Sequence, residues 1–262
     1  MDSLNNYIIY HRLGKGTYGE VYLAENIITK QLVAIKLLYQ LDDNDAVERF
    51  YREIKLLISL RQSENVASII NFGETDNRPF YVMDYYSQGS LRNYVGITNV
   101  IFANKVLYEV SSVLSELDKV GGFHRDIKPD NIMLSKNSSG ETITKLSDFG
   151  LARTMDTTIF TNHAAGSPAY MSPQALNNEP YSIEDDIYSL GITVTELFTG
   201  KRKRREVAEG EDVSKKEKSL IFLLAGMISP SREKRPSLRR IKLNSGAAIG
   251  IPRLTAMGRP NI

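Results

Sequence analysis

The 262-residue sequence contains no cysteine. Disulfide bonds, zinc sites with thiolate ligands, iron–sulfur clusters and a cysteine nucleophile are therefore excluded. Long apolar runs are also absent, because the longest nearly unbroken one, residues 220–228, is too short to cross a bilayer. Residues 1–10 lack the basic and apolar regions of a signal peptide. These absences lead us to expect a cytoplasmic protein without a transmembrane segment.

Acidic residues are scarce at one end of the chain. Residues 1–200 hold 17 Lys and Arg against 25 Asp and Glu, whereas residues 201–262 hold 16 against 6. No acidic residue follows Pro236. The net charge of +2 therefore hides an acidic part of −8 and a basic part of +10.

Periodicity divides the chain into a β-rich front and a mostly helical remainder. Runs rich in β-branched and aromatic residues occupy residues 7–13, 20–25, 31–38 and 71–86, with shorter ones at 132–135 and 142–146. Helical patterns cover residues 41–60, 91–119, 186–198 and 219–228. This order predicts an α+β protein in two lobes.

A glycine-rich segment lies between the first two predicted strands. Gly14, Gly16 and Gly19 fit the pattern G-x-G-x-x-G, which lets backbone N–H groups approach phosphates. A strand pattern follows, whereas the dinucleotide-binding version opens a helix. The segment is therefore either a flap over phosphates or an ordinary glycine-rich hairpin.

A lysine and a glutamate are both placed among apolar residues. Lys36 lies inside the apolar strand 31–38, and Glu53 falls within the apolar stripe of the predicted helix 41–60. A buried carboxylate is costly unless it is paired, so Lys36 is its natural partner. The alternative is an edge-strand lysine that extends to water.

The most specific signal is the run from His124 to Asn131. It reads His-Arg-Asp-Ile-Lys-Pro-Asp-Asn, and Asp148-Phe149-Gly150 follows between a predicted strand and a loop. Together the two motifs supply the oxygen ligands that a nucleotide-bound Mg²⁺ requires.

These motifs, in this order, resemble those of eukaryotic-type protein kinases, most closely the bacterial Ser/Thr kinases. The segment 166–173 and the pair Arg235-Pro236 fit the same family. The resemblance implies a bilobal kinase fold over residues 1–243, with the N-lobe at 1–86 and a C-lobe at 87–243 that is shortened after residue 200. Residues 244–262 are expected to form a poorly ordered basic tail.

The resemblance also implies roles, with ATP and Mg²⁺ (or Mn²⁺) as cofactors and a protein Ser or Thr hydroxyl as acceptor. Lys36, braced by Glu53, would hold the α- and β-phosphates. Asp126 would accept the hydroxyl proton, with Lys128 near the γ-phosphate, and Asn131 and Asp148 would hold the metal. The glycines would cover the phosphates. Adenine would lie among Leu13, Val21, Ala34 and Met133, next to the gatekeeper Met83 and the hinge residues Asp84 and Tyr86.

Arg125 resembles the arginine that binds a phosphate on the activation loop of such kinases. Four threonines follow Asp148 and are candidate phosphosites: Thr154, Thr157, Thr158 and Thr161. A phosphate there would order the loop through a bidentate contact. The alternative is a solvated threonine-rich loop.

The chain departs from the family at Gln174, where a glutamate usually pairs with the residue that corresponds to Arg235. We expect the lost charge to weaken the C-lobe by roughly 3–5 kcal/mol. The basic run 201–205 lacks interleaved aromatic residues, which favours a solvated loop over nucleic-acid binding.

Three functions remain open on these residues. The first is an active, ATP- and Mg²⁺-dependent Ser/Thr kinase that also phosphorylates its own activation loop. The second is a weak or inactive pseudokinase that binds nucleotide, and the third is a small-molecule kinase. The complete set of catalytic residues favours the first, and the segment 166–173 argues against the third.

Overall fold

A computed structural model describes residues 3–15, 19–38, 44–152, 166–202 and 213–251. The chain divides into two compact units. Unit 1 consists of Met1–Ser90 and Asn131–Arg153, and unit 2 of Leu91–Asp130 and Thr154–Ile262. The β-rich front and the helical remainder predicted from the sequence are both present.

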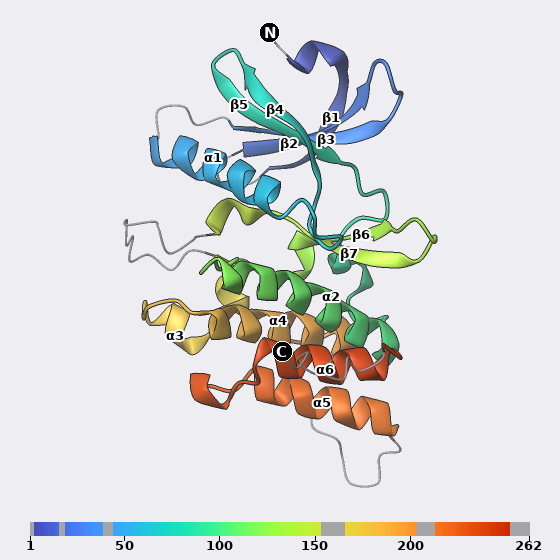
Figure 1. Ribbon diagram of the computed structural model, residues 1–262, viewed down its shortest axis with the longest axis vertical. Coiled ribbons are helices and arrows are strands. Elements are labelled where there is room, and N and C mark those ends of the chain that lie inside the picture. The colour runs from blue at the N-terminus through green and yellow to red at the C-terminus, as the bar shows by residue number, and fades with distance from the viewer. Residues whose placement is uncertain (1–2, 16–18, 39–43, 153–165, 203–212, 252–262) are drawn as a thin grey trace, which may run out of the picture. The chain divides into compact units, whose positions relative to one another are not determined.

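Unit 1 contains a five-stranded antiparallel sheet (Figure 1). Its strands are β1 (Tyr7–Lys15), β2 (Gly19–Asn26), β3 (Leu32–Leu38), β4 (Ile69–Thr75) and β5 (Arg78–Asp84), in the order β1-β2-β3-β5-β4. The sheet encloses a small core of Ala24, Val33, Ile35, Phe80 and Val82. The central position of β3 places Lys36 between two neighbouring strands rather than at an edge.

One helix, α1 (Asn44–Ser59), packs against this sheet. Its apolar stripe is buried, as the periodicity predicts, and includes Phe50, Ile54 and Leu57. Glu53 lies within that stripe and is only 2% exposed. A carboxylate at this depth requires a partner.

A second β-element completes unit 1. Strands β6 (Ile132–Lys136) and β7 (Thr142–Leu146) form a hairpin. The hairpin joins the first 90 residues through backbone hydrogen bonds, Leu134 N to Gly89 O at 2.9 Å and Ala67 N to Leu146 O at 2.9 Å. The single division expected after residue 86 is therefore too simple, because residues 131–153 return to the first unit.

Unit 2 is helical. Its α-helices are α2 (Val100–Lys119), α3 (Pro173–Leu176), α4 (Ile183–Thr199), α5 (Lys215–Met227) and α6 (Leu238–Ala248). Helix α2 packs against α4 and α6 (Figure 1). The apolar α4 is mostly buried and ends at Gly200, whose φ of 75° is the left-handed conformation that glycine adopts readily.

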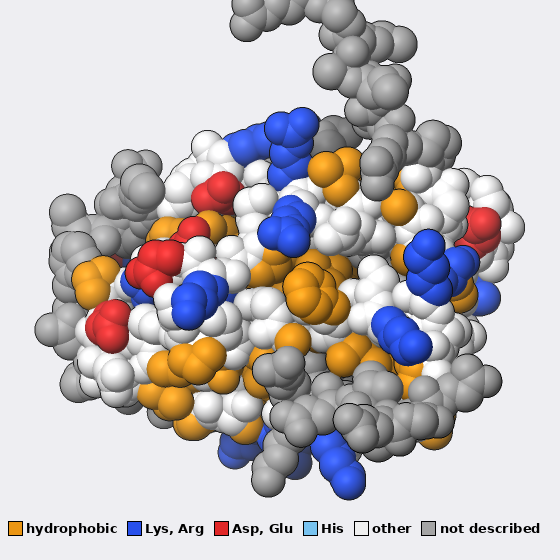
Figure 2. Space-filling view, turned by 90° about the horizontal axis from the view of Figure 1, so that it is seen from below, with side chains coloured by type: hydrophobic (Ala, Val, Ile, Leu, Met, Phe, Trp, Pro, Cys, Tyr) orange, Lys and Arg blue, Asp and Glu red, His pale blue; other side chains and the backbone are white. Residues whose placement is uncertain are grey.

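The last described helix, α6, continues to Ala248, five residues beyond the expected boundary. Its Gly246 lies close to the ring of Tyr108, since an added Cβ atom would come within 3.2 Å of two ring carbons. The remainder of the expected tail, residues 252–262, lies outside the described residues. Helices α5 and α6 expose basic side chains, and Figure 2 shows lysines and arginines among apolar side chains on one face.

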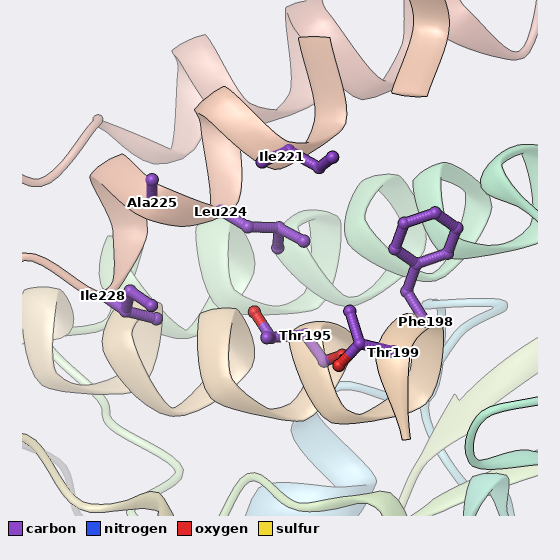
Figure 3. Close-up of a pocket in the computed structure, with 7 residues that line it drawn as sticks. All are labelled: Thr195, Phe198, Thr199, Ile221, Leu224, Ala225 and Ile228. Carbon is purple, nitrogen blue, oxygen red and sulfur yellow. The ribbon is translucent and has the colours of Figure 1, made fainter. Parts of the chain in front are cut away.

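A small apolar pocket lies between α4 and α5. Phe198, Ile221, Leu224 and Ile228 line it, together with threonines of α4 (Figure 3). None of the residues predicted to bind nucleotide or metal contributes to it. No described helix is long and apolar enough to span a membrane.

Candidate active site

In unit 1 the ammonium group of Lys36 lies between two carboxylates. Its Nζ donates to Glu53 Oε1 and Oε2, both at 2.9 Å, and to Asp148 Oδ1 at 2.9 Å. Strand β3 supplies the lysine, α1 the glutamate, and the loop after β7 the aspartate. The ion pair expected between Lys36 and Glu53 is therefore present, and a second carboxylate joins it.

The three groups differ in exposure. The side chain of Lys36 is 15% exposed and that of Glu53 is 2% exposed, whereas that of Asp148 is 48% exposed. Burial lowers the pKa of Lys36, but attraction to Asp148 and Glu53 outweighs it and holds that pKa well above its usual value. Burial raises the pKa of Glu53, and the charge of Lys36 opposes this. The site thus holds a permanently charged ammonium beside an accessible carboxylate.

Tyr81 is a member of this cluster that sequence reasoning missed. It lies opposite Lys36 in the β3–β5 ladder, and its hydroxyl donates to Glu53 Oε1 at 2.9 Å. The side chain is 1% exposed, and burial raises its pKa well above the usual value. Only the strand register reveals this contact, because four consecutive residues of β5 are buried and its apolar run does not single out Tyr81.

The glycine-rich turn joins β1 to β2. Gly14 has open space where a side chain would begin, which permits a ligand to approach the backbone. At Gly19 a Cβ atom would lie 2.6 Å from Leu37 O, so β3 itself excludes a side chain there. Gly16 lies outside the described residues.

The residues expected around adenine all belong to unit 1. Leu13, Val21 and Ala34 lie on β1, β2 and β3, and Met133 lies on β6. Ala34 pairs with Met83 on β5, and Asp84 ends that strand. The hydroxyl of Tyr86 accepts a hydrogen bond from Ser68 N at 3.3 Å, and its backbone O accepts one from Gly89 N at 2.9 Å.

The two expected metal ligands also belong to unit 1. Asn131 O accepts hydrogen bonds from the backbone N and the Oγ of Ser147, at 2.9 and 3.0 Å, which ties Asn131 to the residue before Asp148. Asp148 has a φ of 60°, an unusual value for a residue other than glycine. An amide oxygen and an exposed carboxylate are ligands that suit Mg²⁺, so the residues present fit the metal.

In unit 2 a second set of groups surrounds Asp126. Its Oδ2 accepts a hydrogen bond from Lys128 Nζ at 2.7 Å, and its Oδ1 accepts one from Ser167 N at 3.0 Å. Lys128 Nζ also donates to Ser167 Oγ at 2.8 Å. Sequence reasoning missed Ser167, although it follows Gly166 in a segment already singled out. Both oxygens of the carboxylate are thus oriented.

The backbone that carries Asp126 is held by a buried aspartate on α4. Asp186 Oδ2 accepts a hydrogen bond from His124 N at 2.7 Å, and its Oδ1 accepts one from Arg125 N at 2.9 Å. Burial raises the pKa of Asp186, and these hydrogen bonds counteract the rise. Arg125 has a φ of 72°, and its guanidinium lies 5.2 Å from the ring centre of Tyr181.

A comparison with known proteins shows the family of the chain. Residues 7–245 match the protein kinase domain. The chain belongs to the protein kinase family. This kinase domain is 34% identical over 202 residues to the serine/threonine-protein kinase PrkC of Bacillus subtilis and 32% identical over 199 residues to the serine/threonine-protein kinase Pkn1 of Myxococcus xanthus. It is 30% identical over 264 residues to the CBL-interacting protein kinase 28 of Oryza sativa.

The first two alignments each cover 74% of this chain but only 30% and 29% of the relatives. The rice alignment covers 91% of the chain and 58% of the relative. The chain therefore spans about a third of the length of the bacterial relatives. The family and the bilobal kinase fold are established by these matches.

The departure at Gln174 is compensated within the kinase domain. Arg235 Nη2 donates to Gln174 Oε1 at 2.6 Å, so the amide oxygen keeps a contact with the guanidinium. The charge of Arg235 is not left alone, because its Nη1 lies 3.2 Å from Asp185 Oδ1. The second oxygen of Asp185 pairs with Arg232 at 2.8 Å. The contact between residue 174 and Arg235 is thus a neutral hydrogen bond, as the sequence implies, while α4 supplies a carboxylate for Arg235; the expected weakening of the C-lobe stays a prediction.

Proposed function

We propose that the chain is an ATP-dependent protein kinase that transfers the γ-phosphoryl group to serine and threonine hydroxyls of proteins. The observation that carries the proposal is the double orientation of the Asp126 carboxylate by Lys128 and by Ser167 N. A general base must have a fixed direction toward the proton that it accepts. Family membership and the names of the relatives support the same activity.

In this reaction the hydroxyl oxygen forms a bond to the γ-phosphorus while the bond to the leaving ADP oxygen breaks. Asp126 orients the hydroxyl and receives its proton, and Lys128 places positive charge beside the phosphoryl oxygens. Lys36 holds the nucleotide phosphates. Asn131 and Asp148 would hold Mg²⁺, which would neutralise part of the phosphate charge. Such chemistry depends on positioning and electrostatics more than on covalent help from the protein.

The assembled Lys36 cluster also argues against the pseudokinase alternative. A buried carboxylate such as that of Glu53 lowers stability unless it is paired, and here Lys36 and Tyr81 donate hydrogen bonds to it. A relative that had lost activity would have no need to keep this arrangement. The cluster instead keeps the ammonium charged and in place before nucleotide arrives. Pre-organisation of this kind lowers the cost of reaching the transition state.

The test is phosphate transfer by the purified chain. The chain is incubated with Mg²⁺ and labelled ATP, with and without a generic protein substrate, beside an Asp126→Asn variant of matched fold. We expect label on serine or threonine with the wild type and none with the variant. A folded wild type that binds ATP and labels neither itself nor the substrate would overturn the proposal in favour of a pseudokinase. Label confined to added amino alcohols or aminoglycosides would identify a small-molecule kinase.

The same proposal includes autophosphorylation of the activation loop. The Nε atom of Arg125 is buried and has no hydrogen-bond partner among the described residues. A phosphate satisfies such a donor through a charge-assisted contact. The four candidate threonines lie outside the described residues, so mass spectrometry of the chain after incubation with ATP is the test. Phosphate on none of the four, in a chain that labels other proteins, would contradict this part of the proposal.

A further inference from the structure

A cluster of charged and aromatic side chains in unit 2 surrounds Arg92. This arginine lies in a short 3-10 helix, Leu91–Tyr94. Its guanidinium contacts Asp130, Tyr170 and Glu196, which come from three other segments of the chain. None of the four has a role in the reaction described above.

The contacts use the whole guanidinium. Nε and Nη2 donate to the carboxylate of Asp130, with a shortest distance of 2.7 Å from Nη2 to Oδ2. Nη2 also donates to the hydroxyl of Tyr170 at 2.6 Å, and Nη1 donates to Glu196 Oε1 at 3.1 Å. A planar group with five donors spans three partners in this way, whereas the ammonium of a lysine does not.

The partners of Arg92 are themselves fixed. The Tyr170 hydroxyl donates to Glu196 Oε2 at 2.5 Å, and the side chain of Glu196 is only 9% exposed. Arg202, from the basic run singled out in the sequence, lies 3.7 Å from Glu196 Oε1 and 5.6 Å from the ring centre of Tyr170. Arg92 is therefore held by α4 and by the segment after Ser167, and it holds Asp130 in turn.

Asp130 stands at the end of the catalytic loop. It is four residues after Asp126 and directly precedes Asn131. Its carboxylate accepts hydrogen bonds from Nε and Nη2 of Arg92 and thus forms a bidentate, charge-assisted pair with the arginine.

The loop consequently has two anchors. At its beginning, Asp186 accepts hydrogen bonds from the backbone of His124 and Arg125. At its end, the anchor is Arg92, which acts through the side chain of Asp130. We propose that Arg92 is a positioning residue that fixes the end of the catalytic loop and thereby the direction of Asp126. This inference deepens the proposed kinase function and rests on it.

The expected effect is on turnover. Without the second anchor, residues 127–130 gain freedom and the carboxylate of Asp126 samples unproductive directions. A misplacement of about 1 Å costs on the order of 100-fold in rate, so we expect Arg92→Gln to lower kcat by about 10- to 100-fold. The KM for ATP should change by less than about threefold, because Lys36 and its partners are untouched.

The experiment compares variants of the full chain. Arg92→Gln and Asp130→Asn should lower kcat to a similar extent, and the double variant should be no slower than either single one. Additive losses, or an unchanged kcat in a folded Arg92→Gln variant, would overturn the inference. Arg92→Lys keeps the charge but cannot span the partners, so wild-type turnover in this variant would also overturn it. Arg239→Gln, an exposed arginine on α6, is the matched control and should behave as the wild type.

A second readout does not depend on catalysis. Hydrogen–deuterium exchange of the amides between residues 126 and 131 should be faster in Arg92→Gln than in the wild type, while exchange in the middle of α4 stays the same. Unchanged exchange in the loop would overturn the inference even if the chain is an active kinase. If the loop amides of Arg92→Gln exchange faster but the wild type transfers no phosphate, Arg92 still fixes the loop, and only the proposed kinase function is overturned.

Discussion

Replacing Gln174 by alanine should lower the free energy of unfolding by about 2 kcal/mol. The amide of Gln174 makes two hydrogen bonds, accepting one from Arg235 Nη2 at 2.6 Å and donating one to Pro230 O at 2.8 Å. Alanine removes both. The guanidinium of Arg235 keeps its contacts to Asp185 and to Ser229 O, so its charge stays paired.

The magnitude follows from the two bonds. A hydrogen bond to a charged group contributes roughly 1.5–3 kcal/mol, and a neutral one contributes about 1 kcal/mol. Gln174 is partly exposed, so water replaces part of what is lost. The expected decrease in the free energy of unfolding is therefore about 2 kcal/mol. The substitution weakens the contact between α3 and the segment before Arg235.

Replacing Gln174 by glutamate should have a much smaller effect. The new carboxylate attracts Arg235, but Asp185 already neutralises that charge. The second oxygen of the glutamate would also face Pro230 O, to which the amide now donates. Because the gain and the loss are similar in size, we expect a change within about 1 kcal/mol.

Urea unfolding of the purified chain, followed by circular dichroism, measures both variants. Gln62→Ala, an exposed glutamine, is the control and should leave the midpoint unchanged. If Gln174→Glu stabilised the chain by roughly 3–5 kcal/mol, the charge of Arg235 would be unpaired in solution and the reasoning would be wrong. An unchanged midpoint for Gln174→Ala would refute it equally.

Three further substitutions test the site. Tyr81→Phe removes the hydroxyl that donates to Glu53, so the KM for ATP should rise about threefold at unchanged kcat; an unaltered KM contradicts this. Asp186→Asn removes one of the two carboxylate oxygens that accept hydrogen bonds from the backbone of the catalytic loop, so the free energy of unfolding should fall by about 3 kcal/mol. Urea unfolding measures this change, and an unshifted midpoint contradicts it. Gly166→Ala places a Cβ atom 2.5 Å from Arg125 O at a φ of 122°, so the phosphorylation rate should fall at least about tenfold; wild-type activity would show that the backbone gives way.

The sequence was sufficient for what depends on periodicity and on local motifs. Helix α1 and strand β3 follow from the spacing of apolar residues, and that spacing also put Glu53 on the buried face where it meets Lys36. The ends of helix α4 lie within a few residues of those predicted, because Gly200 terminates it. The protein kinase fold then followed from the order of the motifs.

What the sequence could not supply are contacts between segments that no motif links. Tyr81 reaches Glu53 only because the register of β5 against β3 sets it opposite Lys36. Arg92 and Asp130 are 38 residues apart, and nothing in either local pattern indicates that they pair. Asp185 and Arg235 are 50 residues apart, and the sequence motifs do not indicate that they form an ion pair.

The discontinuity of unit 1 has a consequence for how the chain is made. The ribosome releases residues from the N-terminus onward, and domains generally fold as units during synthesis. The first 90 residues provide Lys36 and Glu53, but the β6–β7 hairpin and Asp148 come only after α2 has been synthesised. The five-stranded sheet is therefore made first, and unit 1 is completed only after some 60 further residues, when the separate β6–β7 hairpin and Asp148 have been synthesised. A nascent chain stalled before residue 131 should consequently be more sensitive to protease within the first 90 residues than one stalled well after residue 153.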